Sequence, residues 1–152
     1  MKRDSRLSSV LHAVLHMAAT DRPMTSEELA TCMSTNPVVV RRTMAGLRDS
    51  GLVRSERGPN GGWTIACDLE RITLRDINAA LGEPALFAVG NRHDNPACLV
   101  EQAVNSALDG AFEAAEALLL ERFAAVTLAS LAADFRERLE RHQTGKGHHD
   151  HA

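Results

Sequence analysis

Four arginines are the side chains of this sequence best suited to binding chemistry: Arg41, Arg42, Arg54 and Arg57. A guanidinium group presents a planar fork of donors that matches phosphate oxygens and the O6 and N7 atoms of guanine. A single arginine is more often a solvated surface charge, so the pattern has meaning only if the four lie on one surface. The elements that carry them decide whether they do.

The first pair lies in a segment with the pattern of two short helices. Thr25 and Glu28 form a capping-box signature, which predicts a helix from about residue 26. Pro37 suits the first position of the next helix, and Gly51 suits its end, so residues 37–50 are predicted to be helical. The short break between the two helices is typical of a helix-turn-helix, and apolar spacing over residues 5–19 predicts a helix before it.

The predicted helix over residues 37–50 has two distinct faces. At about 100° per residue, Val40, Thr43, Met44 and Leu47 share one side, which we expect to face the core. The opposite side carries Val38, Arg41, Arg42 and Ala45. Arg41 and Arg42 are therefore expected to point into solvent about one turn from the start of the helix.

The second pair of arginines flanks a predicted turn between strands. Residues 52–55 and 63–66 alternate as short strands do, and residues 56–62 between them are rich in glycine and proline. This pattern predicts a hairpin with Arg54 and Arg57 near its tip. A helix-turn-helix followed by a two-stranded hairpin is the winged-helix arrangement, so the predicted fold is mainly α with a small two-stranded wing.

The winged helix can contact DNA through its turn, its third helix and its wing. An α-helix fits the major groove, which is about 12 Å wide, and glycines let the wing lie close to the duplex. The predicted DNA-binding residues are Ser34, Thr35, Asn36, Pro37, Val38, Arg41, Arg42, Arg54, Arg57, Gly58, Asn60 and Gly61.

The rest of the chain is predicted to be helical and to join two subunits. A second capping box at Thr73 and Asp76 begins a helix that ends near Gly82, and residues 97–125 and 128–141 are two further helices. We expect a DNA-binding winged helix over residues 1–82, a linker or sensor loop over 83–96, a dimerisation region over 97–141 and a disordered tail over 142–152.

The long helix over residues 97–125 is apolar on two sides. Small residues at four-residue spacing form a ridge beside larger apolar ones, which suits close packing of two helices. Burial by the last helix alone is the intramolecular alternative to a partner subunit. The predicted dimerisation residues are Val104, Ala107, Leu108, Ala111, Phe112, Ala115 and Leu119.

Charge and composition agree with a soluble cytoplasmic protein that binds a polyanion with its first half. The chain has 152 residues, is 44% hydrophobic and contains no run of apolar residues long enough for a membrane span. Its net charge of -3 conceals an asymmetry. Residues 1–66 carry nine Lys and Arg against six Asp and Glu, whereas residues 67–152 carry eight against fourteen. Only the first half is a plausible surface for nucleic acid.

The three cysteines, Cys32, Cys67 and Cys98, are odd in number and far apart, which argues against a disulfide scaffold or a zinc site of CxxC pairs. Cys32 and Cys67 are expected to be packing residues. Cys98 is the candidate redox sensor, because we place it one residue inside a helix whose N-terminus would stabilise a thiolate. A packing role at a subunit interface is the alternative for Cys98.

The histidines predict no metal site. His12 and His16 are four residues apart on one helix, but no third histidine and no cysteine accompanies them in sequence. His148, His149 and His151 lie in the expected tail. A metal-dependent enzyme would need convergent ligands and a general base that the sequence does not offer, so we predict no enzyme activity.

Several segments resemble the Rrf-two family of winged-helix transcriptional regulators. They are residues 36–55, 57–66 and 72–77, with a late motif at 126–131, and the paired glycines before Trp63 are the most specific part. The resemblance implies a homodimer joined through the long helix and, in most members, a repressor of nearby genes. It also implies groove contacts from residues 34–42 and wing contacts from residues 57–62.

Many members of that family hold an iron-sulfur cluster with three cysteines in the loop before the long helix. This chain has only Cys98 in that region, and Glu101 stands where a histidine often follows the last cysteine. It therefore resembles the clusterless subgroup, which implies no cofactor. The signal differs between members of that subgroup, so the resemblance does not identify the effector of this chain, whether a small molecule or a redox signal. We predict a homodimeric repressor on a palindromic operator in double-stranded DNA. A winged helix that docks proteins is the alternative, although it would not need the arginine face.

Overall fold

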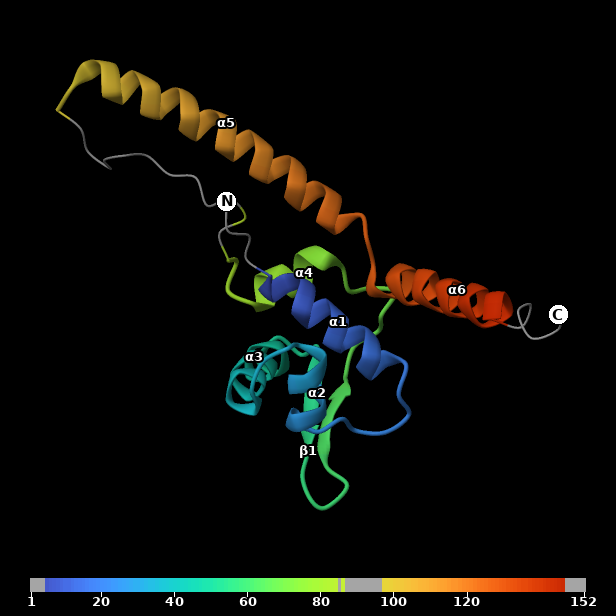
Figure 1. The fold of residues 1–152 in the computed structure, drawn as a ribbon. Helices are drawn as coiled ribbons and strands as arrows, with labels where there is room; N and C mark the ends of the chain where they lie inside the picture. The colour runs from blue at the N-terminus through green and yellow to red at the C-terminus, as the bar shows by residue number, and fades with distance from the viewer. Residues whose placement is uncertain (1–4, 85, 87–96, 147–152) are drawn as a thin grey trace.

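The computed structural model describes residues 5–84, 86 and 97–146. Helices α1 to α4 and a hairpin gather into one body, α5 projects away from it, and α6 leaves in another direction (Figure 1). This arrangement confirms the predicted fold class. The elements are α1 (Arg6–Ala18), α2 (Ser26–Cys32), α3 (Pro37–Asp49), β1 (Val53–Glu56), β2 (Gly62–Ile65), α4 (Leu74–Ala80), α5 (Leu99–Ala124) and α6 (Leu128–Lys146).

Side-chain caps begin two of the helices where the sequence predicts them. The Thr25 hydroxyl accepts a hydrogen bond from the Glu28 amide at 3.2 Å, and the Glu28 carboxylate accepts one from the Thr25 amide at 2.8 Å. Arg22 lies 2.6 Å from the same carboxylate, and together with the Thr25 amide it lowers the pKa of Glu28 to about 2. The same reciprocal cap forms between Thr73 and Asp76 at the start of α4.

Helix α3 is oriented by the burial of one face. Val40, Met44 and Leu47 are fully buried in the core, as their spacing predicts. The helix ends with Gly51 in the left-handed region, at a φ of 77°, which residues with a side chain rarely adopt. The backbone amide of Leu52 then donates to the Leu47 carbonyl at 2.9 Å. That turn occupies Leu52, so β1 begins one residue later than predicted.

The core lies between α1, α2, α3, α4 and the hairpin, and it also includes Leu128 from the start of α6. Three backbone hydrogen bonds fix that junction to the segment before α4. The Leu74 amide donates to the Val126 carbonyl, the Leu128 amide to the Ile72 carbonyl, and the Ala129 amide to the Leu69 carbonyl, at 2.8 to 3.0 Å. Residues 126–129 are thus part of the winged-helix body, although the sequence alone suggests a separate helical region.

The C-terminal helix is longer than the sequence predicts. Instead of ending near Arg141, α6 continues to Lys146, so residues 142–146 of the predicted disordered tail are helical. Within this extension, the Thr144 hydroxyl donates a hydrogen bond to the Glu140 carbonyl, one turn earlier, at 3.0 Å. No proline interrupts residues 128–146. The remainder of the predicted tail, residues 147–152, lies outside the described residues.

Helix α5 is the predicted long helix, and it starts slightly later than expected. Cys98 is its N-cap residue and is exposed, so it precedes the helix instead of lying one residue inside it. None of the residues of α5 is buried within this single chain. Most of the predicted linker or sensor loop, namely residue 85 and residues 87–96, lies outside the described part of the chain.

None of the described helices combines the length and the apolar character needed to cross a lipid bilayer.

Because Leu128 at the start of α6 is part of the core, its truncation should destabilise the fold. Leu128→Ala should lower the free energy of unfolding by about 2–5 kcal/mol, because a fully buried leucine leaves a cavity. Leu139→Ala on the same helix is the matched control, since Leu139 is 43% exposed. Its effect should stay below about 1 kcal/mol. Urea unfolding of both variants tests this, and equal losses would contradict the packing of α6 described above.

Candidate nucleic-acid interface

The turn between α2 and α3 presents short polar side chains at the surface. Ser34 has a φ of 52°, in the left-handed region, so the chain reverses sharply after α2. The Thr35 amide donates to the Ala30 carbonyl at 2.9 Å and closes the turn. Both Ser34 and Thr35 are exposed, so their hydroxyls lie at the outer edge of the helix-turn-helix.

Asn36 has a structural role at the start of α3. Its side-chain oxygen accepts hydrogen bonds from the amides of Val38 and Val39, each at 3.1 Å. These contacts satisfy two of the amides that the first turn of a helix leaves unpaired. A contact between Asn36 and DNA would therefore have to come from its side-chain nitrogen. Pro37 follows as the first residue of the helix and is half-buried.

The outer face of α3 combines two valines with two arginines. Val38 is 62% exposed and Val39 41%, whereas Val40 is fully buried. Arg41 and Arg42 are exposed as predicted. The helical spacing predicted an outward position for Val38 but gave no sign of Val39, which lies at the edge between the two faces.

The two arginines of α3 differ in their surroundings. A nitrogen of Arg41 lies 3.4 Å from a carboxylate oxygen of Glu27 on α2, and both side chains are largely solvent-exposed. Such a pair contributes little stability, so Arg41 can leave it at small cost. Within the described part of the chain, the structure records no ion pair or hydrogen bond for the Arg42 side chain. Arg42 therefore has no local partner to give up when it binds an anion.

The tip of the wing depends on glycines. Gly58 has a φ of 105°, and its carbonyl accepts from the Gly61 amide at 3.0 Å. A Cβ atom on Gly61 would lie 2.2 Å from the Glu56 carbonyl oxygen, so no other residue fits that position. Arg57 and Asn60 are exposed at this tip, and Arg54 on β1 lies 3.5 Å from Glu56.

The base of the wing is anchored to the chain just before α2. The backbones of Met24 and Trp63 exchange two hydrogen bonds, of 3.0 and 2.8 Å, and the Trp63 indole nitrogen donates to the Ser26 hydroxyl at 3.1 Å. Because of this close approach, a Cβ atom on Gly62 would lie 2.5 Å from the Met24 carbonyl oxygen. The paired glycines before the tryptophan thus serve two different contacts. No local pattern in the sequence marks Met24 as the pairing partner of Trp63.

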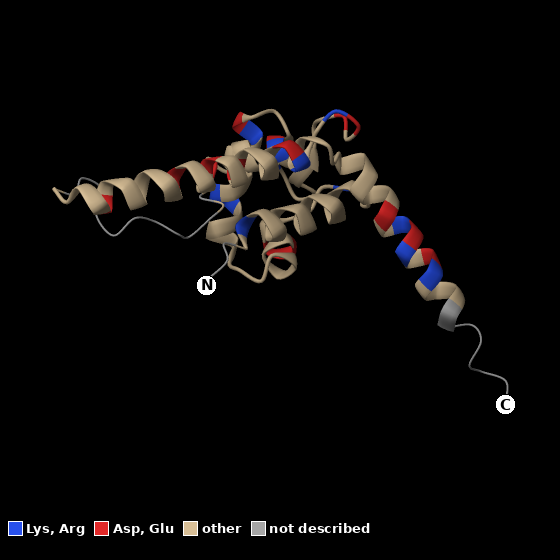
Figure 2. Cartoon of the chain, turned by 90° about the horizontal axis from the view of Figure 1, so that it is seen from above, with Lys and Arg blue, Asp and Glu red and all other residues tan. Residues whose placement is uncertain are grey.

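The predicted contact residues form one end of the molecule. Helix α3 and the hairpin lie on the side of the body opposite α5 (Figure 1). Helix α5 carries Glu101, Asp109, Glu113, Glu116 and Glu121 but only one basic residue, and the coloured segments of its ribbon are mostly red in Figure 2. A polyanion is therefore favoured at the α3 and wing end and disfavoured along α5.

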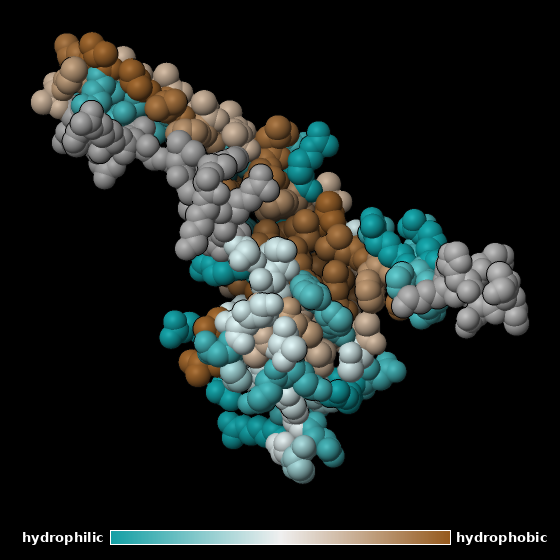
Figure 3. All heavy atoms as spheres, viewed as in Figure 1, coloured by the Kyte–Doolittle hydropathy of each residue, from teal (hydrophilic) through white to brown (hydrophobic). Residues whose placement is uncertain are grey.

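Among the described residues, much of the apolar surface of α5 is exposed. Leu99 is 78% exposed and Val100 72%, and Val104 and Leu108 are also exposed. Hydrophobic atoms follow α5 and its junction with α6 in Figure 3. The other predicted dimerisation residues are exposed or half-buried: Ala107, Ala111, Phe112, Ala115 and Leu119. Helix α6 packs chiefly against α1, so it does not provide the intramolecular cover that the sequence left open.

The cysteines and histidines lie in separate places. Cys32 and Cys67 are half-buried and pack against the core, and burial raises the pKa of the Cys67 thiol. Cys98 is exposed at the other end of the fold. The Nε2 atoms of His12 and His16 approach to 2.9 Å, but no group of three potential metal ligands occurs among the described residues.

Comparisons with known proteins agree on the kind of protein. The family model Rrf2, described as an iron-dependent transcriptional regulator, matches residues 3–134. YwnA of Bacillus subtilis (strain 168), named as an HTH-type transcriptional regulator, is 32% identical over 126 residues, which cover 82% of this chain and 92% of YwnA.

Solved structures show the same fold at lower identity. IscR of T. potens superposes with a TM-score of 0.63 at 21% identity, covering 91% of this chain and 90% of IscR. CymR, the global cysteine regulator of B. subtilis, superposes with a TM-score of 0.57 at 20% identity, covering 88% of this chain and 98% of CymR. With its helix-turn-helix, its wing and its match to the family model over residues 3–134, the chain belongs to the Rrf2 family of transcriptional regulators.

Proposed function

We propose that this chain is a homodimeric repressor that binds a palindromic DNA operator through α3 and the wing. The observation that carries the proposal is the outer face of α3, where Arg41 and Arg42 are exposed opposite a fully buried face. A helix held by its core side and lined with arginines on the other is suited to the major groove.

Base recognition is assigned to side chains of α3. Arg41 and Arg42 have the donors to bind guanine O6 and N7 or to hold phosphates. Val38, exposed beside them, can contact the methyl group of thymine, which is the apolar feature of the major groove. The hydroxyls of Ser34 and Thr35 lie at the turn, where phosphate contacts set the position of the helix.

The wing is assigned to the neighbouring part of the duplex. Arg57, Gly58, Asn60 and Gly61 form its tip, and the structure records no ion pair for Arg57 within the described residues. The glycines leave the backbone of the tip without side chains that would hold it away from the DNA. The hydrogen bonds of Trp63 keep the wing at a constant place relative to α2 and α3.

Dimerisation is assigned to α5. Leu99, Val100, Val104 and Leu108 are 40 to 78% exposed, and a second copy of α5 would bury them. Two subunits related by a two-fold axis present two α3 helices, which is the reason to expect a palindromic operator with half-sites about one helical turn apart.

The iron that the family description implies does not fit the cysteines of this chain. Clusters of this kind need several thiolate ligands in one place. The sequence has three cysteines, and they lie on α2, after β2 and at the start of α5. We therefore propose a regulator without a cluster. Cys98 stays a predicted redox sensor, now placed at an exposed N-cap position.

Loss of either arginine of α3 should weaken operator binding. With DNA fragments selected by the purified protein, Arg41→Ala and Arg42→Ala should each reduce affinity by about 1–3 kcal/mol, and the dependence on salt should become less steep. Fluorescence anisotropy measures both. Arg138→Ala on α6 is the control and should bind as the wild type does.

The outcome of that experiment also separates the two candidate functions. If the unmodified protein selects no DNA sequence, or if the double variant Arg41→Ala and Arg42→Ala binds as well as the unmodified protein, α3 is not the reading element. The protein-docking winged helix would then be the better description.

A larger side chain on the ridge of α5 should weaken the dimer. Ala111→Leu should cost about 1–3 kcal/mol of association free energy, because added methylenes separate closely packed helices. Ala117→Leu is the control, since it lies about 120° around the helix from Ala111. Analytical ultracentrifugation measures the assembly. A wild-type monomer at micromolar concentration would refute the proposed dimer.

Protein purified without oxygen should be colourless. Three separated cysteines cannot ligate one cluster, so neither visible iron-sulfur absorption nor bound iron is expected. Absorption spectra and iron analysis check this. Brown protein with stoichiometric iron would contradict the clusterless assignment.

A further inference from the structure

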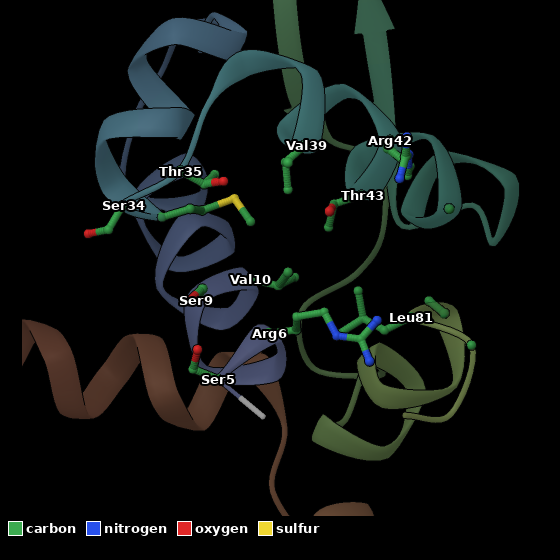
Figure 4. Close-up of a pocket in the computed structure, with 14 residues that line it drawn as sticks. Ser5, Arg6, Ser9, Val10, Ser34, Thr35, Val39, Arg42, Thr43 and Leu81 are labelled. Atoms are coloured by element: carbon green, nitrogen blue, oxygen red, sulfur yellow. The ribbon is translucent and has the colours of Figure 1, made fainter. Parts of the chain in front are cut away.

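A pocket of about 500 Å³ lies in the winged helix, between α1, the turn after α2, α3 and the end of α4 (Figure 4). Its volume is within the range of about 300–1,000 Å³ that is typical of small-molecule sites. It is distinct from the apolar face of α5 and from the tip of the wing. Its walls come from elements that are far apart in the sequence.

The lining of this pocket has a definite chemistry. Two guanidinium groups, of Arg6 and Arg42, contribute positive charge, and none of the described residues that line the pocket is acidic. Hydroxyl groups on several sides can donate hydrogen bonds: Ser5, Ser9, Ser34, Thr35 and Thr43. Apolar side chains complete the walls: Val10, Met33, Val39 and Leu81.

The two arginines approach the pocket from different helices. Figure 4 shows Arg6 extending from α1 between α1 and the end of α4, and Arg42 on α3 at the opposite wall. Arg42 has no ion pair within the described residues, so its binding of an anion breaks no existing contact. Planar guanidinium forks bind carboxylates with two parallel hydrogen bonds.

We propose that this pocket binds a small organic acid, with its carboxylate at Arg42 and its apolar part against Val10 and Val39. The combination of positive charge, hydroxyl donors and apolar walls favours this class over a neutral metabolite or an inorganic anion. Neutral molecules leave the Arg42 guanidinium unmatched, and inorganic anions leave the apolar walls uncovered.

Binding of the acid opposes binding of DNA, a consequence that rests on the proposed function. Arg42, Ser34 and Thr35 belong to the pocket lining and to the proposed DNA surface. A carboxylate that engages Arg42 removes it from the groove contact. Because coupling between two binding sites is reciprocal, bound DNA must lower the affinity for the acid by the same factor by which the acid lowers the affinity for DNA. The acid is thus an inducer of the proposed repressor.

Binding is tested first without DNA, by NMR titration of the full chain. The probes are benzoate, phenylacetate and hexanoate, the matched primary amides, and inorganic phosphate. At low-millimolar concentration, the amide signals of Ser9, Thr43 and Gly46 should shift with at least one acid, and to a much smaller extent with its amide or with phosphate. Equal shifts with acid and amide, or no shift with any acid, would overturn the proposal. Shifts with phosphate alone would show a simple anion site.

Variants separate the pocket from the DNA surface. Arg42→Gln should reduce affinity for the active acid at least tenfold, and so should Ser9→Leu, which fills the pocket without changing charge. Arg41→Gln is the matched control, because Arg41 lies on the same helix but does not line the pocket. It should bind the acid as the wild type does. Equal affinity of wild type, Arg42→Gln and Ser9→Leu would place the acid elsewhere and overturn the proposal.

The effect on DNA is measured separately with the selected operator. A saturating amount of the active acid should raise the Kd for the operator at least fivefold in the wild type and leave Ser9→Leu unaffected. If the acid binds in the pocket but the protein binds no DNA, the pocket assignment stands and the proposed function fails. If DNA binds and the acid binds with no effect on the Kd, the inducer role fails.

Discussion

The attachment of the α5–α6 junction to the segment before α4 is the constraint on which the rest of the arrangement depends. Three backbone hydrogen bonds and the fully buried Leu128 hold this junction against residues 69–74. Without them, α5 would be joined to the winged helix only by the covalent chain, and its direction relative to α3 would not be set. With them, α5 extends from the winged helix in a set direction.

The same attachment links α5 to α3 through α4. Helix α4 contacts both α5 and α3, and the approach of α3 to α4 is close enough that a Cβ atom on Gly46 would lie 3.1 Å from the Ala80 carbonyl oxygen. Packed elements of this kind transmit displacement because they cannot be compressed. We therefore expect that a change at the proposed dimer interface, or in the pocket beside Gly46 and Ala80, would reach the outer face of α3.

The two ends of the molecule carry different charges. The end with α3 and the wing carries exposed arginines that, among the described residues, have only exposed ion-pair partners or none, whereas the charged residues of α5 are mostly carboxylates. Since carboxylates repel phosphate, the duplex has one favourable approach, and the apolar stripe of α5 is left for protein contact. The whole-chain net charge of -3 conceals this division.

Local signals in the sequence determined the helical elements and the outward direction of the α3 arginines. Capping boxes at Thr25 and Thr73, Pro37 and Gly51 act within one turn of the backbone, so their effects can be predicted without knowledge of the fold. The side of α3 that bears Arg41 and Arg42 follows from helical periodicity in the same way. The wing was predicted from its turn residues, although its strands were placed one residue away from their positions in the structure.

Only the tertiary structure decided how these elements meet. The pairing of Met24 with Trp63, the burial of Leu128 against the winged helix and the pocket between Arg6 and Arg42 all join residues far apart in the chain. Such contacts depend on the packing of whole elements, for which a local pattern of residues carries no signal. The sequence therefore predicts which side chains α3 presents, while the pocket beside them, and its link to α5 through α4, exist only in the folded chain.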